Sequence, residues 1–194
     1  MSARKVTIER ATGETQIALT LDLDGAGRAE IDTGLGFLDH MLAQLARHGR
    51  FDVALRCRGD LHVDDHHTAE DCALALGQGF DRALGDRRGV RRFGHAYAPL
   101  DEALVRAVVD FSGRPWAEVH LPLVRPNIGQ VACESLVHVL RSFAIASRAT
   151  LHVDLVRGEN DHHKVEAAFK ALALALRQAV ARDGDEVPST KGVL

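Results

Sequence analysis

The segment His66-His67-Thr68-Ala69-Glu70 returns almost unchanged later in the chain as His162-His163-Lys164-Val165-Glu166. In a helix, residues three and four positions apart share a face, so His66 and Glu70, or His67 and Glu70, can converge on one point. Imidazole with carboxylate is a ligand mixture suited to Mn, Fe, Zn or Ni rather than to Ca or Mg alone. A single motif of this kind also fits a solvated helix N-terminus whose glutamate favours the helix dipole. The repetition favours a metal site.

The elements around the two copies follow the same order. In the first half, alternating apolar residues predict strands over 6–10, 14–23, 28–31 and 51–57, and helical spacing predicts helices over 37–47 and 65–85. In the second half, strands are predicted over 92–98, 103–111, 116–121 and 151–155. A loop over 125–130 precedes a helix over 136–143, and the last helix ends at Gly184. Each half is therefore predicted to be βββαβα.

This order predicts an α+β protein made of two pseudo-repeated βββαβα units, each a sheet with two helices on one face. The first unit covers residues 1–86, the second covers 87–184, and a tail covers 185–194, all in one compact duplicated domain. Such units are similar to the ribosomal protein S5 domain 2-like class, which includes ribosomal and RNA-processing proteins. Because fold alone does not fix function, a non-catalytic RNA-binding module is one alternative.

The repetition extends to the helix that precedes each motif. His40 lies on the helix before the first motif and His138 on the helix before the second, at a similar spacing. Ligands of this kind leave positions open for substrate on a six-coordinate Mn or Fe ion. Since the sets lie in different halves, a site built from two chains of a closed symmetric oligomer is a natural arrangement. The two sets predicted to bind a pair of metal ions are His40, His66, His67 and Glu70, and His138, His162, His163 and Glu166.

Composition narrows the classes of function. The 194 residues carry 24 Lys and Arg against 27 Asp and Glu, a formal net charge of −3, with only one Trp and one Tyr, which argues against nucleic-acid binding. The three cysteines are an odd number set singly in apolar surroundings, which is typical of reduced thiols in a cytoplasmic protein. The sequence has no signal-like N-terminus and no run of about 18 apolar residues, so we expect a cytoplasmic protein without a membrane partner.

Six segments of the chain form a set of motifs: Gly34-Leu-Gly-Phe-Leu-Asp-His40-Met, Asp65-His-His-Thr-Ala-Glu-Asp71, Arg91-Arg-Phe-Gly94, Asp110-Phe-Ser-Gly-Arg-Pro115, Asp161-His-His-Lys-Val-Glu166 and Pro188-Ser-Thr-Lys-Gly192. With these motifs in family order, the chain resembles the imidazoleglycerol-phosphate dehydratase family of histidine biosynthesis over almost its whole length. The resemblance implies a lyase of two similar α+β halves that takes a small phosphorylated imidazole. It also implies two Mn²⁺ per active site, the eight metal ligands already predicted, and a homo-oligomer of 24 subunits with active sites between subunits. The segment 121–130 matches the family least well.

The same resemblance implies roles for residues outside the metal ligands. By similarity, Glu14 is the acid-base residue, and Asp101 and Glu102 are weaker candidates because they open the matching strand of the second half. Guanidinium, hydroxyl and ammonium groups together suit a phosphate dianion. By similarity, Gln44, His48 and Lys170 line the substrate site, and Arg92, Arg114, Ser189 and Lys191 hold the phosphate.

The predicted reaction removes water from D-erythro-imidazole glycerol phosphate and gives imidazole acetol phosphate. An imidazolate ring that meets one Mn ion with each nitrogen can expel the hydroxyl group on the adjacent carbon, while a carboxylate moves the protons. A dinuclear metal hydrolase is the other alternative. Metal content separates the RNA-binding module from both enzymes, and loss of water from the substrate separates the dehydratase from the hydrolase.

Overall fold

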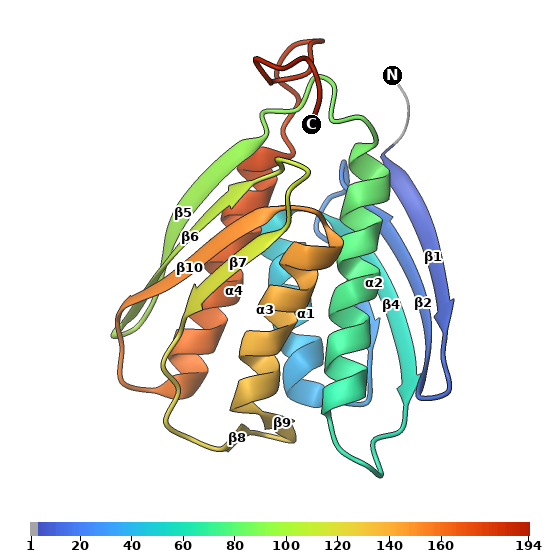
Figure 1. Cartoon of the computed structure of the whole chain (residues 1–194). Helices are drawn as coiled ribbons and strands as arrows, with labels where there is room; N and C mark the ends of the chain where they lie inside the picture. Colours follow the sequence, from blue (N-terminus) through green and yellow to red (C-terminus); the bar gives the residue numbers. More distant parts are fainter. Residues whose placement is uncertain (1–3) are drawn as a thin grey trace.

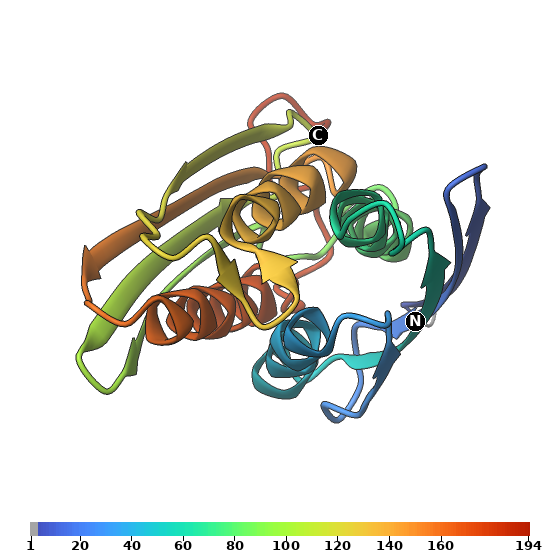
Figure 2. The same ribbon diagram turned by 90° about the horizontal axis from the view of Figure 1, so that it is seen from below.

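The structure, a computed structural model, describes residues 4–194 of the chain (Figure 1). Within this range, four helices form a layer between two four-stranded sheets, as the view along the helices in Figure 2 shows. The predicted α+β architecture is confirmed. Among the described residues, no helix is both long enough and apolar enough to cross a membrane.

The first sheet is formed by β1 (Lys5–Ala11), β2 (Thr15–Asp22), β3 (Ala29–Asp32) and β4 (Asp52–Gly59). Its strands lie in the order β1-β2-β4-β3, and only β3 runs parallel to its neighbour β4. Successive side chains point to opposite faces of a strand. On β2 this buries Ile17, Leu19 and Leu21 against the helices.

The second sheet repeats this plan with β5 (Phe93–Leu100), β6 (Ala103–Asp110), β7 (Trp116–His120) and β10 (Thr150–Arg157). The order is β5-β6-β10-β7, and again only the last pair, β10 with β7, is parallel. The two sheets therefore share one topology, which agrees with the duplication predicted from the motifs.

The helices connect the two halves. α1 (Gly36–Gly49) and α2 (His66–Leu84) cover the first sheet, and α3 (Cys133–Ala146) and α4 (Asp161–Ala179) cover the second. Within the layer, α1 packs on α4 and α2 packs on α3. All four run in the same direction, with their first turns at the lower end in Figure 1. This places both histidine motifs at one end of the molecule.

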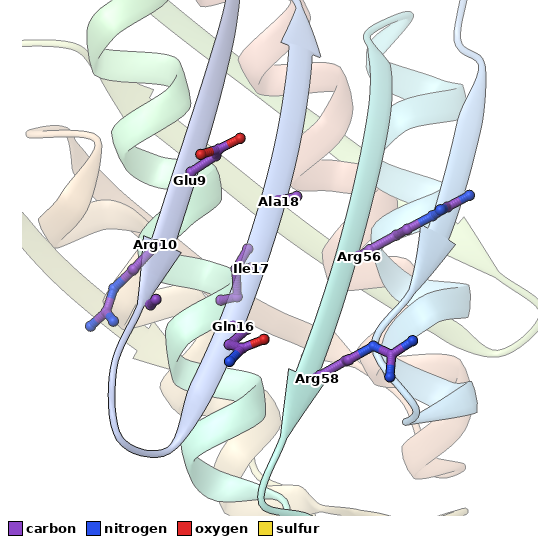
Figure 3. A pocket seen from close by; sticks show the side chains of 8 residues that line it. Glu9, Arg10, Gln16, Ile17, Ala18, Arg56 and Arg58 are labelled. Carbon is purple, nitrogen blue, oxygen red and sulfur yellow. The ribbon is translucent and has the colours of Figure 1, made fainter.

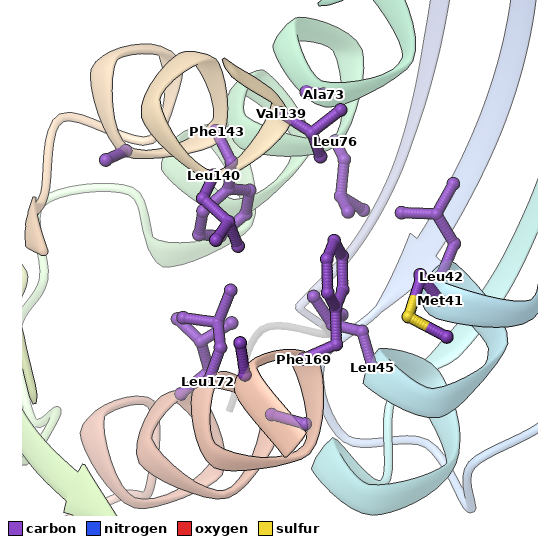
Figure 4. Packing of buried hydrophobic residues seen from close by; sticks show 14 of the residues in the cluster. Met41, Leu42, Leu45, Ala73, Leu76, Val139, Leu140, Phe143, Phe169 and Leu172 are labelled. Carbon is purple, nitrogen blue, oxygen red and sulfur yellow. The ribbon is translucent and has the colours of Figure 1, made fainter. Parts of the chain in front are cut away.

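The core lies where the helices meet. Phe169 of α4 is almost completely buried, and Figure 4 shows its ring between Leu45 of α1 and Leu76 of α2. Leu172 of α4 faces Leu140 of α3 in the same view. Because these contacts join helices of different halves, neither half is expected to keep its core when separated.

Two segments differ from the sequence-based prediction. The segment predicted to be a loop over 125–130 includes β8 (Asn127–Ile128), which forms a short hairpin with β9 (Val131–Ala132). The last helix ends at Ala179, not at Gly184. The reason is tertiary, since the carbonyls of Ala179 and Ala181 accept hydrogen bonds from the amides of Arg92 and Arg91.

Candidate metal centres

The first centre joins α1 and α4. His40, His162 and Glu166 each offer one donor atom, and these atoms all lie within 4.8 Å of one another. Nε2 of His40 is 3.2 Å, and Nε2 of His162 is 3.1 Å, from Oε2 of Glu166. Glu166 is nearly buried while both histidines are partly exposed, so the centre opens to solvent on its imidazole side.

The second centre joins α2 and α3. His66, Glu70 and His138 offer three donor atoms within the same 4.8 Å limit. Nε2 of His138 lies 2.8 Å from Oε1 of Glu70, and the rings of His66 and His138 stack with centroids 4.9 Å apart. Each centre thus consists of a histidine and a glutamate four residues apart on one helix, and one histidine from the neighbouring helix.

The sequence alone does not assign each ligand to an ion, and in the structure each centre takes one histidine from the other half. His40 of the first half lies with the motif of the second, and His138 of the second half lies with the motif of the first. The cause is helix packing: α1 contacts α4 and α2 contacts α3. The helix closest to each motif therefore belongs to the other half.

Polar side chains fix the first turn of each motif helix. Oδ1 of Asp64 accepts a hydrogen bond from the amide of His66, and Oδ1 of Asn160 accepts one from the amide of His162, both at 2.9 Å. Amides in the first turn of a helix have no partner within the helix, so such bonds stabilise it. The histidines are thereby set at equivalent positions in the two halves.

The second histidine of each motif, predicted to be a ligand, lies outside both centres. Nδ1 of His67 is 3.0 Å from Oδ2 of Asp60, and Nδ1 of His163 is 2.7 Å from Oε2 of Glu102. Adjacent residues of a helix point in directions about 100° apart, which turns these rings away from the centres. The hydrogen bond with the carboxylate raises the pKa of each imidazole.

Glu14, the predicted acid-base residue, lies immediately before β2. Its carboxylate is about half exposed, and Oε1 is 3.5 Å from Nε2 of His67. Asp60 was not among the predicted site residues. Its position directly after β4 and ahead of the first motif is the signal by which the sequence could have identified it.

Three predicted substrate residues lie beside the first centre. Gln44 and His48 follow His40 along one face of α1, with Oε1 of Gln44 2.9 Å from Nε2 of His48. Burial, together with the nearby charge of Lys170, lowers the pKa of His48. Nζ of Lys170 is 2.7 Å from Oε1 of Glu166. Burial acts to raise the pKa of Glu166, but hydrogen bonds from Lys170 and His40 outweigh it and lower the pKa to about 2.

Arg92, a predicted phosphate residue, lies at the opposite end of the helix layer. Its amide donates to the carbonyl of Ala179, the last residue of α4. Its guanidinium contacts both carboxylate oxygens of Asp110, at 2.6 and 3.1 Å, and donates to the carbonyl of Pro188 at 2.8 Å. The hydrogen bond to Pro188 holds the start of the tail at this end of the molecule.

The other predicted phosphate residues are at the same end. In the tail, Oγ of Ser189 accepts a hydrogen bond from the amide of Lys191 at 3.2 Å. Gly113, which precedes Arg114, lies against the tail at Leu194. The structure thus brings these residues towards one another, but it places them away from both metal centres (Figure 1).

A cavity of about 420 Å³ lies on the outer face of the first sheet (Figure 3). Its lining includes Glu9 and Arg10 of β1, Gln16 of β2, and Arg56 and Arg58 of β4. None of the residues that line it is a predicted site residue. The chemistry of the donor atoms, and not the size of a cavity, identifies the candidate site.

The donor set and its spacing suit a transition-metal ion. Imidazole nitrogen with carboxylate oxygen is accepted by Mn, Fe, Zn and Ni. Ligand atoms on opposite sides of an ion at about 2.1 Å stand about 4.2 Å apart, and the donor atoms of each centre lie within 4.8 Å of one another. Three donors do not fill the coordination sphere, so each centre can accept further ligands.

Fold and site together define a class: a duplicated α+β protein with two imidazole-carboxylate centres at one end of its helix layer. The sequence model of one family, imidazoleglycerol-phosphate dehydratase, matches residues 33–176. The chain belongs to this family, whose members are hydro-lyases.

Curated relatives that bear this family's name are similar over the whole chain. The Pseudomonas aeruginosa protein is 50% identical over 197 residues, with 100% of both chains covered. The Candida glabrata protein is 55% identical over 206 residues, covering 96% of this chain and 98% of its own. The Phytophthora nicotianae protein is 58% identical over 192 residues, which are 98% of this chain but 42% of that longer protein.

Solved structures of the family share the fold. The crystal structure from Staphylococcus aureus has a TM-score of 0.83 at 34% identity and covers 92% of this chain and 99% of its own. The crystal structure from Pyrococcus furiosus has a TM-score of 0.84 at 37% identity and covers 96% of this chain and 100% of its own. At these identities the likeness supports common chemistry as well as common architecture.

Proposed function

We propose that the protein removes water from D-erythro-imidazole glycerol phosphate to give imidazole acetol phosphate, a step of histidine biosynthesis. The observation that carries this proposal is the pair of equivalent histidine-glutamate centres in a chain of the dehydratase family. An imidazole ring offers two nitrogens, so two similar metal centres suit such a substrate. We propose Mn²⁺ as the ion because imidazole with carboxylate suits it and three donors leave positions open.

The metal ions and the protein have separate tasks in this proposal. Bound ions would polarise the two ring nitrogens and so make the hydroxyl group on the carbon next to the ring easier to expel. His40, His162 and Glu166 would hold one ion, and His66, Glu70 and His138 would hold the other. Gln44 and Lys170 border the first centre, where they can orient the polar groups of the substrate.

Glu14 is the proposed proton carrier. The second carbon of the side chain loses its proton to a carboxylate, the electrons form a carbon–carbon double bond, and the bond from the first carbon to its hydroxyl group breaks. The hydroxide takes up a proton and leaves as water. The enol then gives up its oxygen-bound proton while the carbon next to the ring gains one, which yields the ketone. A partly exposed carboxylate close to His67 can exchange protons at each of these steps.

The distance between the two ends of the helix layer supports active sites shared between subunits. Glu166 and Ala179 are thirteen residues apart on α4, which at 1.5 Å per residue is roughly 20 Å, and Arg92 contacts the far end. The three-carbon chain between ring and phosphate is too short to cover this distance. We therefore propose that one subunit supplies a metal centre and another supplies the phosphate site.

The second histidines of the motifs fit the same scheme. His67 and His163 are partly exposed, and each meets a carboxylate through Nδ1, which keeps Nε2 available as a metal ligand. We propose that they complete the metal centres of neighbouring subunits. This accounts for two motif histidines that contribute to neither centre of their own chain.

The outer face of the second sheet supports a homo-oligomer, for which we propose 24 subunits. Phe93 and Tyr97 of β5, Val108 of β6 and Trp116 of β7 are all exposed on this face. Exposed apolar patches of this kind mark surfaces at which proteins associate. A location in the cytoplasm stays a prediction.

Metal removal and product analysis test the proposal. Protein stripped with a chelator should lose activity and regain it with Mn²⁺, and the product should be imidazole acetol phosphate. Release of inorganic phosphate instead would favour the hydrolase alternative. Full dehydratase activity in protein that holds no divalent metal would overturn the metal part of the proposal.

A further inference from the structure

The structure assigns a positioning role to Asp60 and Glu102. We infer that each carboxylate holds the ring of one motif histidine, His67 or His163, so that Nε2 of that histidine faces a metal ion in a neighbouring subunit. This inference rests on the proposed metal binding. It goes beyond it by naming the groups that orient the two ligands outside the centres.

The contacts are of the same kind in both halves. Oδ2 of Asp60 lies 3.0 Å from Nδ1 of His67, and Oε2 of Glu102 lies 2.7 Å from Nδ1 of His163. A carboxylate can only accept at this point, so in the neutral ring Nδ1 carries the proton and Nε2 keeps its lone pair. Carboxylates in this arrangement fix both the ring orientation and the tautomer of metal-binding histidines.

The two carboxylates come from different positions of the repeat. Glu102 directly precedes β6, as Glu14 directly precedes β2, so Glu102 and Glu14 are equivalent residues. Asp60 instead directly follows β4. The first half therefore orients its histidine from the end of one strand, and the second half does so from the start of another.

This difference separates the roles of Glu14 and Glu102. In the first half Asp60 occupies Nδ1 of the histidine, which leaves the carboxylate of Glu14 on the other side of the ring and about half exposed. In the second half the equivalent carboxylate of Glu102 is itself bound to Nδ1 of His163. Glu102 is therefore a positioning residue, and proton transfer remains with Glu14.

The surroundings of Glu102 make it rigid. It belongs to the two-residue turn that joins β5 to β6, after Asp101, which has a left-handed φ of 47°. Its Oε1 accepts hydrogen bonds from the amides of Glu159 and Asn160, at 3.1 and 2.8 Å, while Oε2 serves His163. One oxygen thus anchors the loop before α4 and the other orients the histidine.

The variant Glu102→Gln separates these two tasks. The amide oxygen of glutamine can still accept from the two loop amides, but its NH₂ group then faces Nδ1 of His163 and favours the tautomer with the proton on Nε2. We expect Mn²⁺ affinity of the assembled enzyme to fall by about 10- to 100-fold, measured by the electron paramagnetic resonance signal of free Mn²⁺. The thermal midpoint of the metal-free variant should stay close to that of the unmodified protein.

Asp60 provides a second, independent pair of variants. Oδ1 of Asp60 is buried without a hydrogen-bond partner among the described residues, so no second contact fixes whether the amide oxygen or the NH₂ group of an asparagine would face His67. Asp60→Asn can turn its amide oxygen to Nδ1 and should keep most of the Mn²⁺ affinity. Asp60→Ala offers no acceptor to Nδ1, so its Mn²⁺ affinity should fall to the same extent as that of Glu102→Gln.

Asp86→Asn is the control, because Asp86 lies after the C-terminal end of α2, beside Arg88 and away from the centres. It should bind Mn²⁺ like the unmodified protein.

If Glu102→Gln and Asp60→Ala both fold and bind Mn²⁺ as tightly as this control, the inference is overturned while the proposed function stands. If the unmodified protein binds no Mn²⁺, the metal part of the proposed function fails instead. Should Glu102→Gln not fold, the contrast between Asp60→Ala and Asp60→Asn decides the question.

Discussion

The carboxylates of the site differ in chemistry because their immediate neighbours differ. Glu14 is half exposed beside His67, whereas Glu166 is nearly buried between His40, His162 and Lys170. The sequence predicted the residue types of the centres, since repeated histidine-glutamate motifs favour metal binding. It could not predict which side chains share a centre, because that depends on helix packing.

Glu14 gives the first prediction. Glu14→Gln removes the proton carrier but keeps the size of the side chain, so kcat should fall by about 100-fold or more while KM changes little. Steady-state kinetics with the imidazole glycerol phosphate substrate measure both constants. Glu9→Gln, an exposed glutamate on the adjacent β1, should behave like the unmodified protein. A kcat for Glu14→Gln equal to that of Glu9→Gln would contradict the assigned role.

Glu166 gives a prediction about pH. Its pKa in the folded protein is about 2, below the ordinary value of 4.5, so ionised Glu166 stabilises the fold above pH 4.5. This stabilisation is lost as the pH falls from 4.5 towards 2. In metal-free protein, the thermal midpoint should therefore drop more between about pH 5 and about pH 3 than it does in Glu166→Gln. An equal drop in both proteins would show that the pairing with Lys170 and the histidines does not stabilise the fold.

Strands and helices were largely predictable because most of them bury one face, which gives the sequence a period of two or of 3.6. Two segments could not be predicted from such a period. The hairpin of β8 and β9 has two residues in each strand, too few to show a period. The end of α4 is set by hydrogen bonds from Arg91 and Arg92, which lie far away in sequence. The position of Asp60 between β4 and the first motif is visible in the sequence, but its contact with Nδ1 of His67 depends on the fold.

The contact of β5 with α4 gives a prediction about packing. A Cβ atom at Gly94 would lie 1.9 Å from the carbonyl oxygen of Ala175, so the helix would have to move away from the sheet. Gly94→Ala should lower the free energy of unfolding by about 3 kcal/mol or more, seen as a lower thermal midpoint. At Gly13 a Cβ atom meets nothing within 4 Å. Gly13→Ala should therefore leave the midpoint nearly unchanged, and similar midpoints for the two variants would contradict the packing described.

The whole molecule presents its metal centres at one end of the helix layer and its predicted phosphate residues at the other. This arrangement supports the proposal that neighbouring copies bring opposite ends together. The exposed aromatic residues on the outer face of the second sheet suit such an assembly. The sequence suggested shared sites through the duplication, but the separation of the two ends became visible only in the fold.

Mixed oligomers test the sharing of sites. His67→Ala and His162→Ala subunits should each form inactive enzymes, because each lacks a ligand of the proposed sites. When the two are dissociated, mixed and reassembled, some sites should receive an intact centre from one variant and His67 from the other, so activity should return. His162→Ala mixed with Glu166→Ala is the control, since both remove a ligand from the same centre of one chain. Lack of recovery in the first mixture would argue for sites contained in single subunits.

The most direct measurement is an anomalous-scattering map from crystals of the assembled protein grown with Mn²⁺. Two peaks per chain are predicted, one within reach of His40, His162 and Glu166 and the other within reach of His66, Glu70 and His138, with His67 and His163 of neighbouring subunits beside them. Peaks elsewhere, or none at these two centres in crystals of active enzyme, would contradict the account.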